Sequence, residues 1–188
     1  MDPTKRPRRA DSRRNYERLL SVADAAFAER GTSAPLEGIA RESGVAIGTL
    51  YGHFPTRLAL IDALLHERNE ALFAEGERLR AQEPPGEALE AWIRAAVDHA
   101  AIYQGLAALL VAGIDDRASD LHDACRRMES IGGRIAAGAS EAGAVRRGVT
   151  AADVSTVISA VAWVREQVSP AQADRLLATA LAGLRQAS

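Results

Sequence analysis

Apolar residues recur along this chain at intervals of three and four positions, and runs that alternate apolar with polar residues are scarce. Such spacing places the apolar side chains on one face of an α-helix. The chain is punctuated by prolines, which can begin or end helices but break their interiors. They stand at positions 3, 7, 35, 55, 84, 85 and 170. The pattern predicts an all-α fold of about nine helices.

The boundaries of the predicted helices follow from the ends of the apolar stripes, from prolines, and from glycines such as Gly31 that can close a helix. Thr56 is the expected N-cap of a long fourth helix. The predicted helices cover residues 12–30, 35–43, 47–54, 57–82, 86–103, 121–142, 151–167 and 170–185, with a less regular stretch up to Ile114.

Two of these helices carry clear stripes that should be buried. The stripe of the first helix is Tyr16, Leu19, Leu20, Ala23 and Phe27. The stripe of the long fourth helix is Leu58, Ile61, Leu65, Leu72 and Leu79. A helix with one such stripe packs it against neighbouring elements.

The segment IARESGVAIGTLYGHF, residues 39–54, has the spacing of a helix-turn-helix. Ala40 is small where a second helix must cross closely, and Gly44 comes four residues later, where a turn needs a positive φ angle. Val45 and Leu50 can then bury the second helix against the first. In this motif the second helix enters the major groove of DNA with its N-terminal residues.

The residues at the front of the second helix are therefore candidate base contacts: Ala46, Ile47, Gly48 and Thr49. Small side chains allow the backbone to approach the duplex, and Thr49 can contact a base edge through its hydroxyl or its methyl group. Candidate phosphate contacts are Tyr51, His53 and Arg57. Tyr51 and Phe54 could instead be core aromatics, which is the favoured interpretation for Phe54, and His53 could be an ordinary surface residue.

The longer block FAERGTSAPLEGIARESGVAIGTLYGHFPTRLALIDALL, residues 27–65, resembles the DNA-binding domain of the TetR family of bacterial transcriptional regulators. The resemblance implies a recognition helix at 47–54, a homodimer, and a C-terminal region that binds a small effector. Members of the family mostly repress transcription and leave DNA when the effector binds. Relatives often carry a phosphate-binding threonine where this chain has Ala34 and Pro35, so Ser33 is the nearest candidate hydroxyl.

The charge distribution favours the same division into two parts, residues 1–57 and residues 58–188. The first part holds ten Lys and Arg against seven Asp and Glu, whereas the second holds 13 against 18. Residues 1–18 alone carry seven basic and three acidic groups. A basic arm on an acidic body suits contact with a polyanion such as double-stranded DNA, although the arm could also be a solvated tail.

Other classes of function find little support in the sequence. The single cysteine, Cys125, excludes an internal disulfide and a multi-cysteine zinc site, and no histidine follows a glutamate by three residues as a di-iron helical bundle requires. We therefore expect no cofactor, no metal and no enzymatic activity. No apolar run approaches a membrane span, so we expect a cytoplasmic protein. A helical-bundle enzyme or a nonspecific nucleic-acid binder with an accidental helix-turn-helix pattern are the alternatives.

The last two predicted helices each carry a long apolar stripe. Their stripes are Val154, Val157, Ile158, Val161 and Val164, and then Ala173, Leu176, Leu177, Ala180, Leu181 and Leu184. Two such pairs could form a four-helix dimer interface, and burial inside one subunit is the alternative. Residues 86–142 should line an effector pocket, with Trp92, His99, Tyr103, Leu106–Val111, His122 and Met128 as plausible lining.

Overall fold

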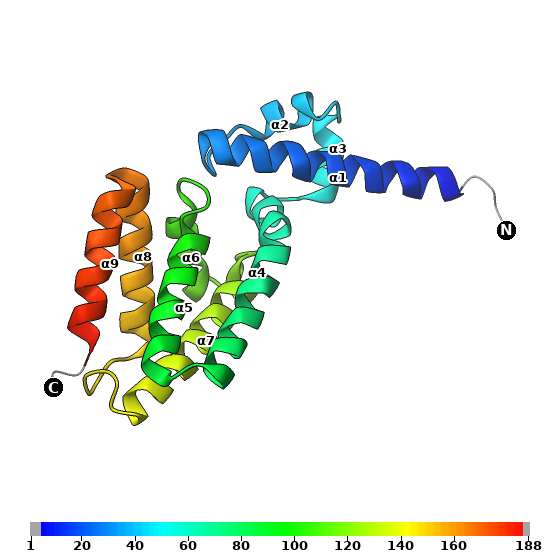
Figure 1. Cartoon of the computed structure of the whole chain (residues 1–188). Helices are drawn as coiled ribbons and strands as arrows, with labels where there is room; N and C mark the ends of the chain where they lie inside the picture. The colour runs from blue at the N-terminus through cyan, green and yellow to red at the C-terminus, as the bar shows by residue number, and fades with distance from the viewer. Residues whose placement is uncertain (1–4, 186–188) are drawn as a thin grey trace. The chain divides into compact units, whose positions relative to one another are not determined.

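A computed structural model describes residues 5–185 of the chain, with side chains from residue 11 onward. All regular secondary structure in this range is helical, which confirms the predicted all-α fold (Figure 1). The helices are α1 (Lys5–Arg30), α2 (Leu36–Glu42), α3 (Ile47–His53), α4 (Arg57–Gln82), α5 (Pro85–Ala100), α6 (Leu106–Asp115), α7 (His122–Glu141), α8 (Ala151–Gln167) and α9 (Pro170–Leu184).

Most predicted boundaries agree with the structure within three residues, but the predicted start of α1 at residue 12 is wrong. The helix begins at Lys5 and includes much of the predicted basic arm, whose first four residues lie outside the described range. Pro7 is compatible with this start because the first turn of a helix does not use its own N–H groups as intrahelical donors. The residues before Ser12 are mostly charged and form no apolar stripe, so the sequence pattern did not reveal that they belong to the helix.

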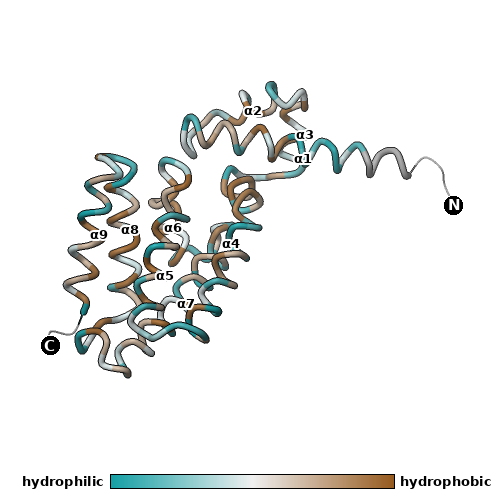
Figure 2. Tube along the Cα trace, in the orientation of Figure 1, coloured by the Kyte–Doolittle hydropathy of each residue, from teal (hydrophilic) through white to brown (hydrophobic). Residues whose placement is uncertain are grey.

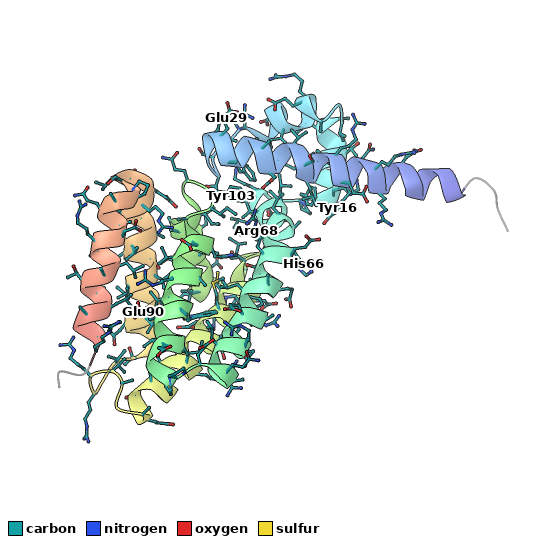
Figure 3. The ribbon with its side chains drawn as sticks, viewed as in Figure 1. Tyr16, Glu29, His66, Arg68, Glu90 and Tyr103 are labelled. Carbon is teal, nitrogen blue, oxygen red and sulfur yellow. The ribbon has the colours of Figure 1, made fainter. Side chains whose placement is uncertain are left out.

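The chain divides into two compact units, Met1–His66 and Glu67–Ser188. The predicted boundary at 57–58 lies at the start of α4, and the division between the units falls inside the same helix. In the N-terminal unit, α1, α2 and the beginning of α4 bury Leu19, Phe27, Ile39, Leu60 and Ile61. Tyr16, which was expected in the buried stripe, is 36% exposed at the edge of this core (Figure 3).

The C-terminal unit is a bundle in which α8 packs against α9, α7 and α5, and α5 packs against α7. Hydrophobic positions recur along α8 and α9 among hydrophilic ones (Figure 2). The bundle core includes Trp92 from α5, Ile135 from α7 and Val161 from α8. Arg165 of α8 pairs with Asp98 of α5 and, at 3.2 Å, with Asp174 of α9, so one guanidinium joins three helices at the surface.

Local sequence explains how the last two helices begin. The Thr150 side chain accepts a hydrogen bond from the Asp153 backbone N–H at 3.2 Å, and the Asp153 carboxylate accepts one from the Thr150 N–H at 2.8 Å. This reciprocal pair is a capping box, which satisfies N–H groups that a helix start leaves open. Bonds from the Thr150 hydroxyl and N–H lower the pKa of Asp153. Ser169 caps α9 in the same way by accepting from the Gln172 N–H.

Two polar side chains of the C-terminal unit are buried. Asn69 of α4 and His99 of α5 are 4% and 8% exposed, and neither the Asn69 Oδ1 nor the His99 Nε2 has a hydrogen-bond partner within the described residues. Burial, with a smaller contribution from the nearby Arg68 charge, lowers the pKa of His99 to about 4. His99 is therefore neutral in the folded protein at physiological pH.

The stability of the protein should depend on pH through His99. Because its pKa is lower in the folded state than in the unfolded state, the unfolded chain binds the proton first as pH falls. The contribution of neutral His99 is complete above about pH 6.5 and is lost between about pH 6.5 and 4, a difference of roughly 3 kcal/mol. Urea unfolding of the wild type and of His99→Gln at several pH values should show a smaller loss over this interval in the variant. Parallel pH profiles would contradict this assignment.

Candidate nucleic-acid interface and internal cavity

The turn between α2 and α3 is held by its own backbone. Gly44 has φ +67°, a conformation that side chains with a Cβ rarely adopt, and its N–H donates to the Arg41 carbonyl at 3.1 Å. The Val45 N–H donates to the Ala40 carbonyl at 3.0 Å, as does the Ser43 hydroxyl at 2.8 Å. These bonds turn the chain sharply enough for α3 to start three residues after Gly44, as the sequence pattern predicted.

Apolar burial then fixes the orientation of α3. Ala40 and Leu50 are almost fully buried, and Val45 is 8% exposed, which confirms their expected packing role. Phe54 is also buried, as favoured from the sequence. Because Leu50 points into the unit, the residues on the opposite side of α3 must point outward.

The outward side of α3 holds most of the candidate DNA contacts. Ile47 and Tyr51 are 39% and 43% exposed, and Ala46 and Gly48 are exposed as well. Tyr51 lies four residues after Ile47 and three after Gly48, so it shares one face of α3 with both. Thr49 is half-buried at the edge of this face. A Cβ added to Gly48 would meet no atom within 4 Å, so the surface here is open.

His53 lies apart from this face, in an aromatic cluster with Tyr16 and Phe54. The Tyr16 and His53 rings meet edge to face with centroids 5.8 Å apart, and the Tyr16 and Phe54 centroids are 5.1 Å apart. Tyr16 is labelled on α1 in Figure 3. Together with Ser12 and Arg13, Tyr16 and His53 line a shallow surface hollow, so α1 offers further polar groups beside α3 that the sequence pattern did not indicate.

Arg57 has a role that the sequence did not reveal. Its Nη1 donates to the Thr32 carbonyl at 2.9 Å and also to the Ala34 carbonyl, so it fastens the α1–α2 loop to the start of α4. The side chain is half-buried. A guanidinium carries five N–H donors, so other donors remain for a phosphate. Ser33, within the same loop, is exposed.

The C-terminal unit contains a small cavity of about 60 Å³. Most of its lining is apolar and comes from α5, α6, α7 and α8, and the polar lining residues are Glu129, Ser155 and Ser159. Of the lining expected from the sequence, Trp92, Ala107, Leu110, Val111 and Met128 are present. His99, Tyr103 and His122 are elsewhere, and the His122 Nδ1 lies 2.9 Å from the Gly113 carbonyl oxygen.

The lining that α8 contributes, and Cys125 of α7, were not expected from the sequence. Val154, Ser155, Ile158 and Ser159 of α8 face the cavity, as does Cys125 of α7. Val154 and Ile158 belong to the apolar stripe that was interpreted as a dimer surface. An apolar stripe that is wide enough to contact two neighbouring elements indicates that one of its edges faces the interior of the same subunit. The width of the α8 stripe was therefore the signal that could have revealed this lining.

The stripes of the last two helices are in fact largely used within the unit. Val154, Val161, Ala173, Leu177 and Leu181 are buried in its core. The large apolar side chains that stay outside are Trp163 on α8 and Leu176 on α9, which are 56% and 38% exposed. Beside Trp163, a groove of about 620 Å³ follows α6 and α8 and is lined mainly by apolar atoms.

Within residues 5–185, no group of three or more His, Cys, Asp or Glu side chains is arranged to hold a metal ion. None of the helices described combines the length and the apolar character that crossing a bilayer demands.

Two family models match the chain. Residues 19–64 match the model described as bacterial regulatory proteins of the tetR family, and residues 84–186 match the SbtR-like C-terminal domain of transcriptional regulators. A curated HTH-type transcriptional regulator of Staphylococcus aureus is 29% identical over 85 residues, which cover 44% of this chain and 44% of that protein. The chain thus matches less than half the length of that relative.

Solved structures extend the similarity over nearly the whole chain. A TetR transcriptional regulator from Streptomyces coelicolor is 35% identical, with a TM-score of 0.62 over 92% of this chain and 99% of that one. A TetR regulator from Mycobacterium vanbaalenii is 34% identical, with a TM-score of 0.54 over 95% and 99%. With a helix-turn-helix that exposes one face of α3 and a helical C-terminal unit that matches the family over most of its length, the chain belongs to the TetR family of bacterial transcriptional regulators.

Proposed function

We propose that this protein is a cytoplasmic, ligand-responsive repressor that binds a palindromic DNA operator as a homodimer and leaves it when a small molecule binds. The observation that carries the proposal is the outward face of α3, where Ile47 and Tyr51 are exposed beside the open surface at Gly48. Exposed apolar and aromatic residues around a glycine suit close approach to base edges and to thymine methyl groups. Family membership supports the same role.

The roles of the candidate DNA contacts follow from their positions. Ala46, Ile47, Gly48 and Thr49 meet bases, whereas Ser33, Tyr51, His53 and Arg57 meet phosphates or support the residues that do. Apolar contacts and shape carry much of the base recognition, because no residue at the front of α3 has the paired donors or acceptors of a bidentate contact. Phosphate contacts set the register of the protein on the duplex.

Selection from a random duplex library tests the function directly. The expected product is an inverted repeat whose half-sites lie about one helical turn apart, because each subunit of a symmetric dimer presents one α3. Thr49→Ala should relax the preference at one base position in each half-site and leave the remaining consensus unchanged. Enrichment of no consensus at moderate salt would rule the proposal out.

Arg57 should contribute to DNA binding and to folding separately. Arg57→Ala is expected to lower stability by about 1–3 kcal/mol, since the Thr32 and Ala34 carbonyls lose their donor. It should also weaken binding to all sequences and reduce the slope of log affinity against log salt by about one. Urea unfolding and binding titrations at several salt concentrations measure the two effects.

Arg57→Lys is the matched variant, because it keeps the charge without the geometry of the guanidinium. It should show most of the stability loss while its salt slope stays close to that of the wild type. If the slope of log affinity against log salt in Arg57→Ala equals that of the wild type, Arg57 supports the α1–α2 loop and does not contact DNA.

The outer face of α8 and α9 supports the proposed dimer contact. Trp163 and Leu176 are exposed there, and tryptophan is among the residues that contribute most to protein interfaces. A second copy that covers Trp163 removes its apolar surface from water, which favours association. Two copies also supply the two α3 helices that a palindrome requires.

Trp163→Glu should therefore shift the protein toward monomer, because burial of a charge opposes association. Sedimentation velocity measures the change, and operator affinity should fall with it. Ile47→Glu is a matched control, with the same kind of substitution on α3: it should remain dimeric and lose operator binding alone. A dimeric Trp163→Glu would show that the contact lies on another surface.

A further inference from the structure

Three segments of the chain share one order of residue types: two arginines, two further residues, and then a serine or threonine. They are residues 8–12, 126–130 and 146–150, which end at Ser12, Ser130 and Thr150. Protein kinases select their substrates partly by such charge patterns, because arginines pair well with carboxylates in an acidic substrate groove. Each hydroxyl is therefore a candidate acceptor of a phosphoryl group, and the structure distinguishes among the three.

Ser130 lies in the middle of α7, a helix that is packed into the bundle core. Its neighbour Ile131 is buried, and the Ser130 hydroxyl accepts a hydrogen bond from the Arg134 Nη1 at 3.1 Å. Glu129, directly before it in the chain, is a negative charge that opposes a phosphoryl group. A kinase reaches Ser130 only after α7 opens locally, and a segment with buried apolar contacts opens at a high free-energy cost.

Thr150 is exposed, but its hydroxyl belongs to the capping box of α8. It donates to the Asp153 carboxylate at 2.7 Å and accepts from the Asp153 N–H at 3.2 Å. The same bonds with Thr150 lower the pKa of Asp153 and keep it ionised. A phosphoryl group on Thr150 breaks the bonds of its hydroxyl and places a second negative charge beside Asp153, so the start of α8 opposes the modification.

Ser12 is exposed in a part of α1 that the core holds only weakly. Among the side chains described from residue 11 onward, those of α1 become fully buried only at Leu19, and Asn15 alone is half-buried before it. The start of α1 extends beyond α2 and α3 (Figure 1). A short helical segment with few tertiary contacts is marginally stable in water, so the turn around Ser12 can open for an enzyme at little cost.

Ser12 also lies beside the end of α3. It lines the shallow hollow with Arg13, Tyr16 and His53, and His53 is the last residue of α3. The Tyr16 and His53 ring centroids are 5.8 Å apart, and Ser12 precedes Tyr16 by about one helical turn, or roughly 6 Å along α1. In the proposed complex α3 enters the groove, so the hollow beside its end lies next to the duplex backbone.

We propose that Ser12 accepts a phosphoryl group from a nucleoside triphosphate through a protein kinase, and that this modification weakens operator binding. The Ser12 Oγ forms a bond to the γ-phosphorus, and the bond from that phosphorus to the β-phosphate oxygen breaks. The hydroxyl proton passes to a base of the kinase, and a nucleoside diphosphate leaves. The effect on operator binding rests on the proposed function, whereas the modification itself does not.

The expected effect follows from the charge that the modification adds. Phosphoserine carries about −1.5 to −2 charges at neutral pH and has three acceptor oxygens. Arg13, beside it in the hollow, pairs with Glu17 at 2.8 Å, and both side chains are exposed. Because an exposed ion pair contributes little free energy, phosphoserine can take Arg13 as its own partner. The hollow then repels the phosphates of the duplex, whatever their base sequence.

The first test incubates the full chain with MgATP and a purified serine/threonine kinase that selects arginines four and three residues before its acceptor. Peptide mapping by mass spectrometry should place the phosphoryl group on Ser12 and leave Ser130 and Thr150 unmodified. Ser12→Ala should abolish the incorporation, and Thr150→Ala should leave it unchanged. Incorporation at Ser130 or Thr150 instead, or none into the chain while the kinase modifies a standard peptide, overturns the proposal.

The second test compares operator affinity before and after phosphorylation. Affinity should fall at least about tenfold at about 0.1 M salt and by a smaller factor at about 0.5 M, because salt screens the repulsion. The consensus selected by the phosphorylated protein should stay the same, since the base contacts of α3 are unchanged. Equal affinities of the two forms overturn the effect on operator binding.

Ser12→Glu and Ser21→Glu form a matched pair on α1. Ser21 is also exposed, and the nine residues between the two positions make about two and a half turns, so the serines lie on opposite sides of the helix. Ser12→Glu should weaken operator binding by about threefold or more, and Ser21→Glu by less than about twofold. Ser12→Gln, which adds no charge, should bind like the wild type. Equal losses in the two Glu variants would overturn the role of the hollow.

The two levels of the proposal fail in different ways. If the protein with phosphorylated Ser12 binds a selected operator with unchanged affinity, the effect of the modification is overturned and operator binding stands. If no palindrome can be selected, the proposed function falls, and peptide mapping still decides whether Ser12 is the acceptor because it needs no DNA.

Discussion

The structure depends on one helix, α4, which contributes apolar side chains to two hydrophobic cores. Near its start, α4 buries Leu60, Ile61 and Leu65 in the N-terminal unit, and further along it buries Leu72 and Leu79 in the C-terminal unit. One continuous helix thus contributes apolar side chains to the cores of both units. The N-terminal core also positions α3 through Leu50 and Phe54. Packing in the N-terminal core thus determines which face of α3 is exposed.

Local signals in the sequence predicted the elements well. The turn at Gly44, the cap at Thr56 and the small residue at Ala40 each act within a few positions of where they stand, so a single sequence reveals them. Which element an apolar helix face packs against depends on residues that are far away in the sequence. The stripes of α8 and α9 were visible, but the sequence could not show that Val161 and Leu177 pack inside their own unit while Trp163 stays outside.

For the polar residues of the candidate site too, the sequence does not reveal contacts with distant parts of the chain. The position of Arg57 after the recognition helix indicates a phosphate contact, but its bonds to the Thr32 and Ala34 carbonyls depend on a loop more than twenty residues earlier. The cavity is similar, because Cys125, Ser155 and Trp92 meet only when three helices converge. A sequence pattern identifies the face of a helix, and the fold decides which distant groups that face meets.

The exposed apolar side chains of α3 and those of α8 and α9 lie on two surfaces that differ in the charge around them. On α3, Ile47 and Tyr51 belong to residues 1–57, whose balance of charge is basic and attracts a polyanion. On α8 and α9, Trp163 and Leu176 belong to the acidic remainder, which repels DNA. In the proposed function, an identical copy covers this apolar face with a surface of the same apolar character. Under that proposal, charge favours a different kind of partner at each surface, and the burial of apolar area then strengthens each contact.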